Sequence, residues 1–358
     1  MTMNPTTAPA KTQMSIRSLP RRLLMSEFFI LYLCIFFFVI LLPFIPVIAT
    51  PYNLSNLLSN IWPLFTVAIG QTLVLIIAGI DLSQGAVISL SSVIGGAFIA
   101  TKVDPIVFSK SPLWGRLLFE NGSILSNVSW GLAVALAAMV AVGLLVGLFN
   151  GVAIAYLRIP AFMVTLVTSM FCGALAIYLV KSENIINLPP SFTNIGEDTG
   201  LFSYSMVIAV VLAIITQFVL SRTKYGRWLY AIGTNMRASV VSGVPTRRVI
   251  ILTYMFSGFC AAVASVLYSS RMEMGRPTLG EPFLLDIIGG AVIGGSSLSG
   301  GKGKILWTFF GVAFLSLLGN ALSLLNVPFF WIEIVKGSVI LLAALIDVTR
   351  TRILLRNV

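Results

Sequence analysis

The chain has 358 residues, of which 58% are apolar and 10% charged. A soluble domain carries roughly 25% charged residues, so this composition excludes an ordinary soluble protein, and the length allows about ten membrane spans of roughly 20 residues. The net charge of +11 comes from basic residues clustered between apolar segments, which indicates membrane topology and argues against nucleic-acid binding.

Metal and redox chemistry have little support in the composition. Histidine, the commonest metal ligand and the usual proton shuttle, is absent. The three cysteines, Cys34, Cys172 and Cys260, lie far apart, each inside an apolar segment. This spacing predicts neither a zinc site nor a disulfide framework, and we expect all three to be packing residues.

The apolar segments follow one another along the whole chain. Residues 1–27 are polar and basic and are expected to form a cytoplasmic tail. The first apolar run, residues 28–49, exceeds the 7–15-residue core of a signal peptide, so we interpret it as an uncleaved first span. Further runs cover residues 61–80, 86–100, 128–149, 161–180, 204–221, 250–270, 283–299, 305–325 and 329–346.

The charges between these runs assign the two sides of the membrane. With the N-terminus in the cytoplasm, ten spans place loop 222–249 inside, where it has six basic residues and no acid, and the tail 347–358 also falls inside. Loops 181–203 and 271–282 fall outside, and their basic residues are accompanied by acids. Loop 101–127 fits less well, because it lies outside with a slight basic excess.

Two stretches, residues 81–96 and 286–301, match without a gap. The matching pairs are Asp81/Asp286, Gly85/Gly290, Ala86/Ala291, Val87/Val292, Ile88/Ile293, Ser91/Ser296, Ser92/Ser297, Gly95/Gly300 and Gly96/Gly301. In the ten-span order the first copy runs outward and the second inward. We therefore predict an all-α integral membrane protein with a five-plus-five inverted repeat, residues 28–180 and 204–346, joined by a periplasmic linker. This architecture is typical of transporters.

Asp81 and Asp286 stand at the edges of apolar runs, and two roles are open for them. As N-caps, their carboxylates would accept backbone N–H bonds at the positive end of a helix dipole. As pathway groups, they would contact the transported solute. Glu333 and Lys336 are one helical turn apart in the last span, so we expect them to pair with each other.

The glycine-rich run Gly295–Lys302 superficially resembles a phosphate-binding loop. The first glycine of that motif is missing at the required spacing, and neither Lys302 nor Lys304 is followed by Ser or Thr. The sequence also contains no nucleophile and base in an arrangement typical of a membrane hydrolase. We therefore expect the chain to bind neither ATP nor another cofactor, and not to be an enzyme.

The cytoplasmic stretch 221–249 is far longer than the 4–6 residues that a connection needs. Residues 231–244 have a short helical pattern that ends at Gly243, where a left-handed glycine and the following Pro245 suit a helix stop. One interpretation is an interfacial helix on anionic lipid. The other is a docking helix for a soluble subunit.

Several motifs, taken together, resemble the ribose-type permeases, the membrane subunits of bacterial ATP-binding-cassette importers for monosaccharides. The similarity covers about residues 55–348. Its motifs are Gly79-Ile-Asp-Leu-Ser83 with Gly85, Asn150-Gly151, Ala161-Phe162, Thr223-Lys-Tyr-Gly-Arg227, the docking residues Gly233, Asn235, Ala238, Ser242 and Gly243 with Val244, Asp286, and Gly294–Gly303. The family usually has an acid and then a small residue after the loop asparagine. Here Met236 and Arg237 stand there, so the carboxylate for a salt bridge at position 236 is missing.

The resemblance implies the energy source, the partners and the candidate sites. A cytoplasmic ATPase, which holds ATP and Mg²⁺, would dock on residues 231–244, a periplasmic solute-binding protein would dock outside, and a second permease copy or relative would complete the path in the inner membrane. The residues that we assign to the path or repeat motif are Asp81, Ser83, Gly85, Asn150, Phe162, Asp286, Gly290, Ser296 and Ser297. Those that we assign to the binding-protein contact are Arg271, Glu273, Arg276 and Glu281. The alternative is a secondary carrier or facilitator, which would need coupling-ion ligands or proton relays.

Overall fold

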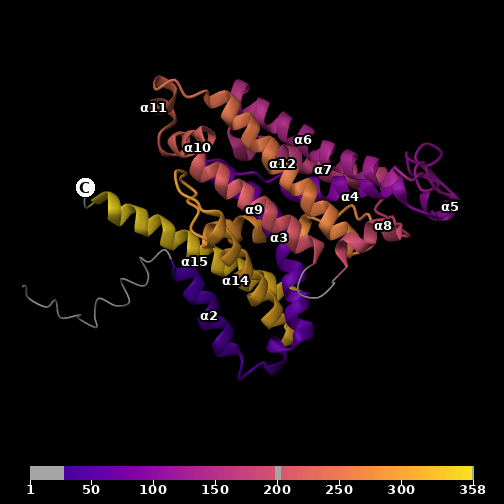
Figure 1. Cartoon of the computed structure of the whole chain (residues 1–358), viewed down its shortest axis with the longest axis horizontal. Coiled ribbons are helices and arrows are strands. Elements are labelled where there is room, and N and C mark those ends of the chain that lie inside the picture. The colour runs from indigo at the N-terminus through magenta and orange to yellow at the C-terminus, as the bar shows by residue number, and fades with distance from the viewer. Residues whose placement is uncertain (1–27, 198–202, 357–358) are drawn as a thin grey trace, which may run out of the picture.

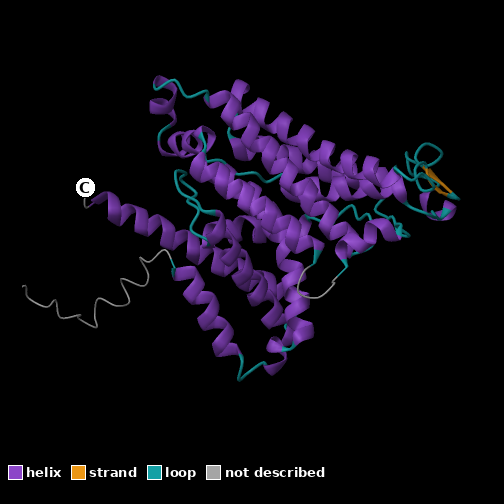
Figure 2. Ribbon diagram, viewed as in Figure 1, coloured by secondary structure: helices purple, strands orange, loops and turns teal. Residues whose placement is uncertain are grey.

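The computed structural model describes residues 28–197 and 203–356, with side chains up to residue 346. Most of this part is helical and is joined by loops (Figure 2), and its strands form one short hairpin of β1 (Leu118–Phe119) and β2 (Gly122–Ser123). The predicted tail 1–27 and residues 198–202 of the predicted linker lie outside the described residues. The chain is therefore an all-α multi-pass membrane protein.

The helices follow the apolar runs closely. They are α2 (Phe29–Leu41), η2 (Pro46–Ala49), α3 (Pro51–Ile76), α4 (Gln84–Ile99), α5 (Pro105–Phe108), α6 (Gly131–Leu157), α7 (Ala161–Val180), α8 (Pro190–Thr193), η3 (Asn194–Gly196), α9 (Tyr204–Arg222), α10 (Lys224–Thr234), α11 (Met236–Val241), α12 (Thr246–Arg271), η4 (Glu281–Phe283), α13 (Leu284–Ile293), α14 (Ile305–Leu324) and α15 (Phe329–Arg356). In the described part, seven helices are long and apolar enough to cross a membrane: α3, α6, α7, α9, α12, α14 and α15. Helices α2 and α4 are apolar but shorter.

Several helices end or begin away from the predicted run. The predicted first span 28–49 is interrupted, because α2 ends at Leu41 and only the short η2 follows, and α6 continues past residue 149 to Leu157. Helix α3 starts ten residues before position 61, where Thr50 caps it by accepting a hydrogen bond from the Asn53 N–H at 3.3 Å. Helix α15 continues into the predicted tail as far as Arg356. Helix α13 stops after 10 residues, about 15 Å at 1.5 Å per residue, because Gly295 follows in a left-handed conformation with a φ of 86°.

Helices α3 and α12 form the centre of the bundle. In the most apolar stretch of α3, 94% of the residues are buried, compared with 6% in α15, which is peripheral. Helix α12 packs along α6 and α3. A side chain on Gly258 of α12 would overlap the carbonyl oxygen of Gly143 on α6, and the reverse also holds. The two backbones touch there, as small residues permit in membrane proteins.

Loops from distant parts of the chain meet at two opposite ends of the bundle (Figure 1). At the end that carries α10 and α11, which we name the α11 end, the turn after α3 contacts α10 and the loop 294–304. At the end that carries α5 and α8, which we name the α8 end, Ile185 pairs with Gly275, and the Thr101 N–H donates to the Asn187 carbonyl at 2.8 Å. These two ends position the candidate sites.

Candidate functional site

The long loop between α9 and α12 folds into two short helices rather than one. Asn235 separates α10 from α11 with an extended backbone, and its Oδ1 caps α11 by accepting a hydrogen bond from the Ala238 N–H at 3.0 Å. Ser242 ends α11, and Gly243 follows with a φ of 78°. The predicted left-handed glycine at position 243 is confirmed, whereas the single helical pattern over 231–244 is wrong because Asn235 interrupts it.

Helix α11 presents an apolar surface away from the rest of the protein. The side chains of Met236, Val240 and Val241 are 50%, 54% and 89% exposed. Ser239 is buried instead, and its Oγ donates to the Asn235 carbonyl at 2.9 Å. Exposed apolar side chains gathered on one short helix are typical of an interaction site. Ala238 and Ser242 are exposed on the same short helix.

Helix α10 connects this surface to the core of the bundle. A side chain on Gly233 would overlap the carbonyl oxygen of Ile76 at the end of α3, and that same oxygen accepts a hydrogen bond from the Gly301 N–H at 2.9 Å. The Tyr230 hydroxyl donates to the Gly303 carbonyl at 2.7 Å. Burial raises the pKa of Tyr230, so this donor stays protonated at neutral pH. Helix α10 therefore cannot move without affecting α3 and the loop 294–304.

The loop 294–304 places Ser296 and Ser297 at the α11 end, beneath α10. The Ser297 N–H donates to the Lys302 carbonyl, and the Gly300 N–H donates to the Ser297 carbonyl, both at 3.1 Å. Gly300 and Gly301 have φ values of 84° and 72°. Because these N–H groups already bind carbonyl oxygens, they do not form an open phosphate cradle.

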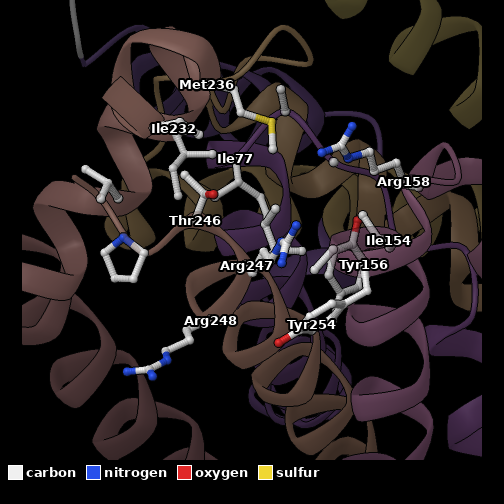
Figure 3. Close-up of a pocket in the computed structure, with 18 of the residues that line it drawn as sticks. Ile77, Ile154, Tyr156, Arg158, Ile232, Met236, Thr246, Arg247, Arg248 and Tyr254 are labelled. Carbon is white, nitrogen blue, oxygen red and sulfur yellow. The ribbon is translucent and has the colours of Figure 1, made fainter. Parts of the chain in front are cut away.

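A cleft of about 1030 Å³ lies beside α10 and α11 (Figure 3). It is lined by apolar residues of the turn after α3, of α6 and of α11, and by four arginines and no acid in the described part of the chain. The arginines are Arg158, Arg237, Arg247 and Arg248. The guanidinium of Arg247 lies 5.0 Å from the centre of the Tyr156 ring, a cation–π contact. The sequence motifs gave no sign that Tyr156 and Arg158 belong to this site.

Asp81 is fully buried and is surrounded by hydroxyl groups. Its Oδ1 accepts hydrogen bonds from the Ser83 N–H at 3.0 Å and from the Ser83 hydroxyl at 2.6 Å, and its Oδ2 accepts one from the Ser257 hydroxyl at 2.6 Å. No described cation forms a salt bridge with it. Helix α4 begins after Ser83 without a side-chain cap, so the Asp81 carboxylate does not fill the capping role, one of the two that the sequence left open.

The Asp81 network extends to four helices. Asn150 of α6 donates to the Ser83 Oγ at 2.9 Å and accepts from the Thr168 hydroxyl of α7 at 2.7 Å. Gln84 of α4 donates to the Ser257 Oγ of α12 at 2.8 Å. The structure thus brings together the predicted residues at positions 81, 83 and 150. Thr168, Gln84 and Ser257 escaped the sequence reasoning because hydroxyls and amides are common in buried helices.

Two further path candidates lie outside this network. Gly85 packs so closely on η4 that a Cβ would stand 2.7 Å from the carbonyl oxygen of Gly280. Phe162, near the start of α7, is 51% exposed. Gly85 therefore allows two segments to approach, whereas Phe162 belongs to the outer surface of the single chain.

Asp286 lies in the first turn of α13 and forms an ion pair. The Lys336 Nζ of α15 donates to its Oδ2 at 2.7 Å, and the Glu333 Oε1 is farther from the same nitrogen, at 3.5 Å. The predicted Glu333–Lys336 pair is therefore confirmed, but Asp286, which the sequence did not connect with it, is the nearer partner of the lysine. Helix α13 has no side-chain cap, so capping is also wrong for Asp286. Its neighbour Gly290 packs closely on Val312 of α14.

The residues assigned to the binding-protein contact all lie at the α8 end. Glu273, Arg276 and Glu281 are exposed. Arg271 is only partly exposed, and its Nη2 donates to the Asn56 Oδ1 at 2.7 Å. Arg271 therefore holds the start of α3 in place, and the other three side chains form the accessible part of this surface.

Comparison with known proteins identifies the family. The family model of the "Branched-chain amino acid transport system / permease component" matches residues 53–344. The ribose import permease protein RbsC of Bacillus subtilis (strain 168) is 33% identical over 305 residues, 84% of this chain and 86% of that protein. The L-arabinose ABC transporter permease protein AraH of Azospirillum brasilense is 28% identical over 304 residues, 85% of this chain and 82% of that protein.

The xylose transport system permease protein XylH of Haemophilus influenzae (strain ATCC 51907 / DSM 11121 / KW20 / Rd) is 28% identical over 364 residues, 84% of this chain and 90% of that protein. No solved structure gives a significant match. The family match extends from the beginning of α3 almost to the end of the described side chains and includes the Asp81 network, α10, α11 and the loop 294–304. The chain therefore belongs to the family "Branched-chain amino acid transport system / permease component". Within this family it is similar to the import permeases for ribose, xylose and L-arabinose.

Proposed function

We propose that this chain is the permease subunit of an ATP-binding-cassette importer and carries a monosaccharide or similar small polyhydroxy solute across the bacterial inner membrane. The observation that carries the proposal is helix α11, whose apolar side chains are exposed while α10 anchors it to α3 and to the loop 294–304. The names of the similar permeases, which refer to ribose, xylose and arabinose, support the solute class.

In the proposed assembly, two permease subunits, identical or related, enclose the path. A cytoplasmic ATPase pair holds ATP and Mg²⁺ and docks on α11, and a periplasmic binding protein docks at the α8 end. When ATP closes the ATPases, α10 and α11 would move together and shift α3 and α13, so that the path alternates between the two sides. The permease itself would bind no cofactor and perform no covalent chemistry.

The proposed topology has ten spans in a five-plus-five inverted repeat, with both termini in the cytoplasm. Two observations support it. Helix α4 packs on α6 and α7, as its counterpart α13 packs on α14 and α15, and α12 packs on α6 as α3 packs on α14. Loops that the topology places on the same side of the membrane also contact one another. Ile185 pairs with Gly275 on the proposed periplasmic side, and Gly233 lies against Gly301 on the proposed cytoplasmic side.

Cysteine labelling tests this topology. Ser191 on α8 and Ser242 after α11 are both exposed, and each is replaced by cysteine in a permease that lacks the three native cysteines. We expect an impermeant thiol reagent to label Ser191→Cys in intact spheroplasts and Ser242→Cys only after lysis. Labelling of both variants from the same side would contradict the ten-span model.

Gly243→Asp tests the docking surface. This change adds strain at a φ of 78° and a charge beside α11. We expect the permease to insert at normal levels while the co-expressed ATPase no longer co-purifies and sugar-stimulated ATP hydrolysis is lost. The matched control is Gly115→Asp, since Gly115 also has a left-handed φ, 71°, and open space around it, but lies in the 101–127 loop.

The two glycine variants should differ clearly. Gly115→Asp should keep ATPase binding and stimulated hydrolysis, because its strain and charge lie away from α11. Equal behaviour of the two variants would refute docking at α11. A permease that transports sugar without any ATPase would instead favour a secondary carrier.

A further inference from the structure

A second cavity, of about 280 Å³, lies between α3, α13, α14 and α15, on the side of the bundle away from the Arg-rich cleft. Its lining includes polar side chains of α3 and α14. These are Asn56, Asn60, Ser316, Asn320 and Ser323. Asn56, Asn60 and Ser323 are exposed, and polar side chains at the membrane rarely face lipid. We infer that these three form the mouth of the cavity on the α8 side.

The Asp286–Lys336 ion pair lies in the interior of this cavity. Lys336 is seven residues after the start of α15, about 10 Å along the helix axis at 1.5 Å per residue. The Asp286 Oδ2 is occupied by the lysine, but its Oδ1 is buried and has no hydrogen-bond partner among the described residues. An unsatisfied buried carboxylate oxygen costs free energy unless a donor reaches it. A hydroxyl group of a ligand could supply that donor.

The charges of the lining select for a neutral ligand. Asp286 and Lys336 carry opposite charges, and no other charged side chain lines the cavity in the described part of the chain. A charged ligand would therefore disturb the ion pair and would itself be poorly compensated, because buried charges are stable only when paired. A neutral molecule with several hydroxyl groups can accept from amide and ammonium groups and donate to the carboxylate.

An apolar wall faces part of the same space. Tyr268 of α12 and Phe283 of η4 line the cavity, and their rings stack with centroids 4.3 Å apart and planes 7° apart. A monosaccharide combines hydroxyl groups with apolar C–H faces, so it suits a lining that is polar on one side and aromatic on another. The volume is close to the lower limit of about 300 Å³ for small-molecule pockets, which disfavours a disaccharide.

We propose that this cavity is a solute site within the single permease subunit, where one neutral monosaccharide binds from the periplasmic side. This inference rests on the proposed function, because it takes the transported solute to be a monosaccharide. The hydroxyl groups of the sugar donate to the Asp286 Oδ1 and accept from Asn60 and Lys336. The site gives each subunit its own contact with the solute, separate from the path between two subunits.

The test is protection of a cysteine at Ser316, in a permease without native cysteines that is expressed without its partner proteins. A small impermeant methanethiosulfonate reagent is added to spheroplasts with ribose, xylose, galactose or arabinose. We expect at least one sugar to slow modification of Ser316→Cys about threefold when its concentration is about twice its dissociation constant, since occupancy slows the reaction by 1 + [L]/Kd. Sucrose at the same osmolarity should give no protection.

Three variants serve as controls. Ser191→Cys should be modified at the same rate with and without sugar, because it lies outside the cavity. Adding Asn60→Leu to Ser316→Cys should remove the protection but leave the thiol reactive, since among the described residues the Asn60 amide bonds only to the Asn56 carbonyl of its own helix, at 2.9 Å. Adding Ser55→Leu, on the same helix but not in the cavity lining, should leave the protection intact.

Two results would overturn the proposal. One is a Ser316→Cys thiol that the reagent does not reach while Ser191→Cys is labelled. The other is a thiol that reacts at the same rate with every sugar in the panel. Neither result would affect ATPase co-purification or stimulated ATP hydrolysis, so failure of this site can be distinguished from failure of the proposed transport function.

Discussion

Replacement of Asp286 by asparagine is expected to destabilise the permease by about 3–5 kcal/mol, the usual cost of removing one partner of a buried ion pair. The variant would leave the Lys336 ammonium, whose side chain is 14% exposed, without its partner at 2.7 Å. Thermal unfolding of the purified protein and its yield in membranes measure the effect. Because the loss comes from the lysine, which keeps only the more distant and more exposed Glu333 at 3.5 Å, the double variant Asp286→Asn with Lys336→Met should recover most of the stability.

Two other carboxylates serve as comparisons. Glu333→Gln should change stability by less than about 1 kcal/mol, because Glu333 is more exposed and 3.5 Å from the lysine. Asp81→Asn should also be tolerated better than Asp286→Asn, since the donors around Asp81 are hydroxyl and N–H groups and the amide retains one acceptor oxygen. Equal losses for Asp81→Asn and Asp286→Asn would support the symmetry expected from the repeat and contradict the ion-pair argument.

Gly233→Ala is expected to uncouple the ATPase from the membrane helices. The added methyl group would overlap the Ile76 carbonyl oxygen and crowd the Gly301 N–H, so α10 must move away from α3. Overpacking of this kind costs about 1–3 kcal/mol, which is enough to displace α10 without unfolding the whole bundle. We expect near-normal insertion into the membrane and weaker co-purification of the ATPase. Sugar uptake should fall about tenfold, which corresponds to about 1.4 kcal/mol for displacing α10 from its coupled position.

The matched control for this variant is Gly337→Ala. Gly337 is also a helical glycine, but a Cβ there would meet nothing within 4 Å. The change should leave uptake intact and stabilise the helix by about 0.5–1 kcal/mol, because alanine has a higher helix propensity than glycine. If Gly233→Ala transports as well as Gly337→Ala, the contact between α10 and α3 has no part in coupling.

The sequence by itself determined the helical segments and much of the docking loop. Apolar runs are long and uninterrupted, so α7 and α14 begin at the predicted residues 161 and 305. Gly243 was also predictable, because a left-handed helix stop is a local property of the backbone, whereas the break at Asn235, which caps α11, was not predicted. The motif residues Asp81, Ser83 and Asn150 meet in the structure, although only the family resemblance connected them in the sequence.

The tertiary structure alone decided which polar groups pair across the bundle. Glu333 and Lys336 suggest an ion pair by their spacing, but the packing of α13 against α15 brings Asp286 closer. The repeat likewise matches Asp81 with Asp286 by residue type, yet one precedes its helix and the other lies within a helix turn. Spacing along a chain records only neighbours within one helix, whereas a buried charge takes the partner that the packing of several helices brings nearest.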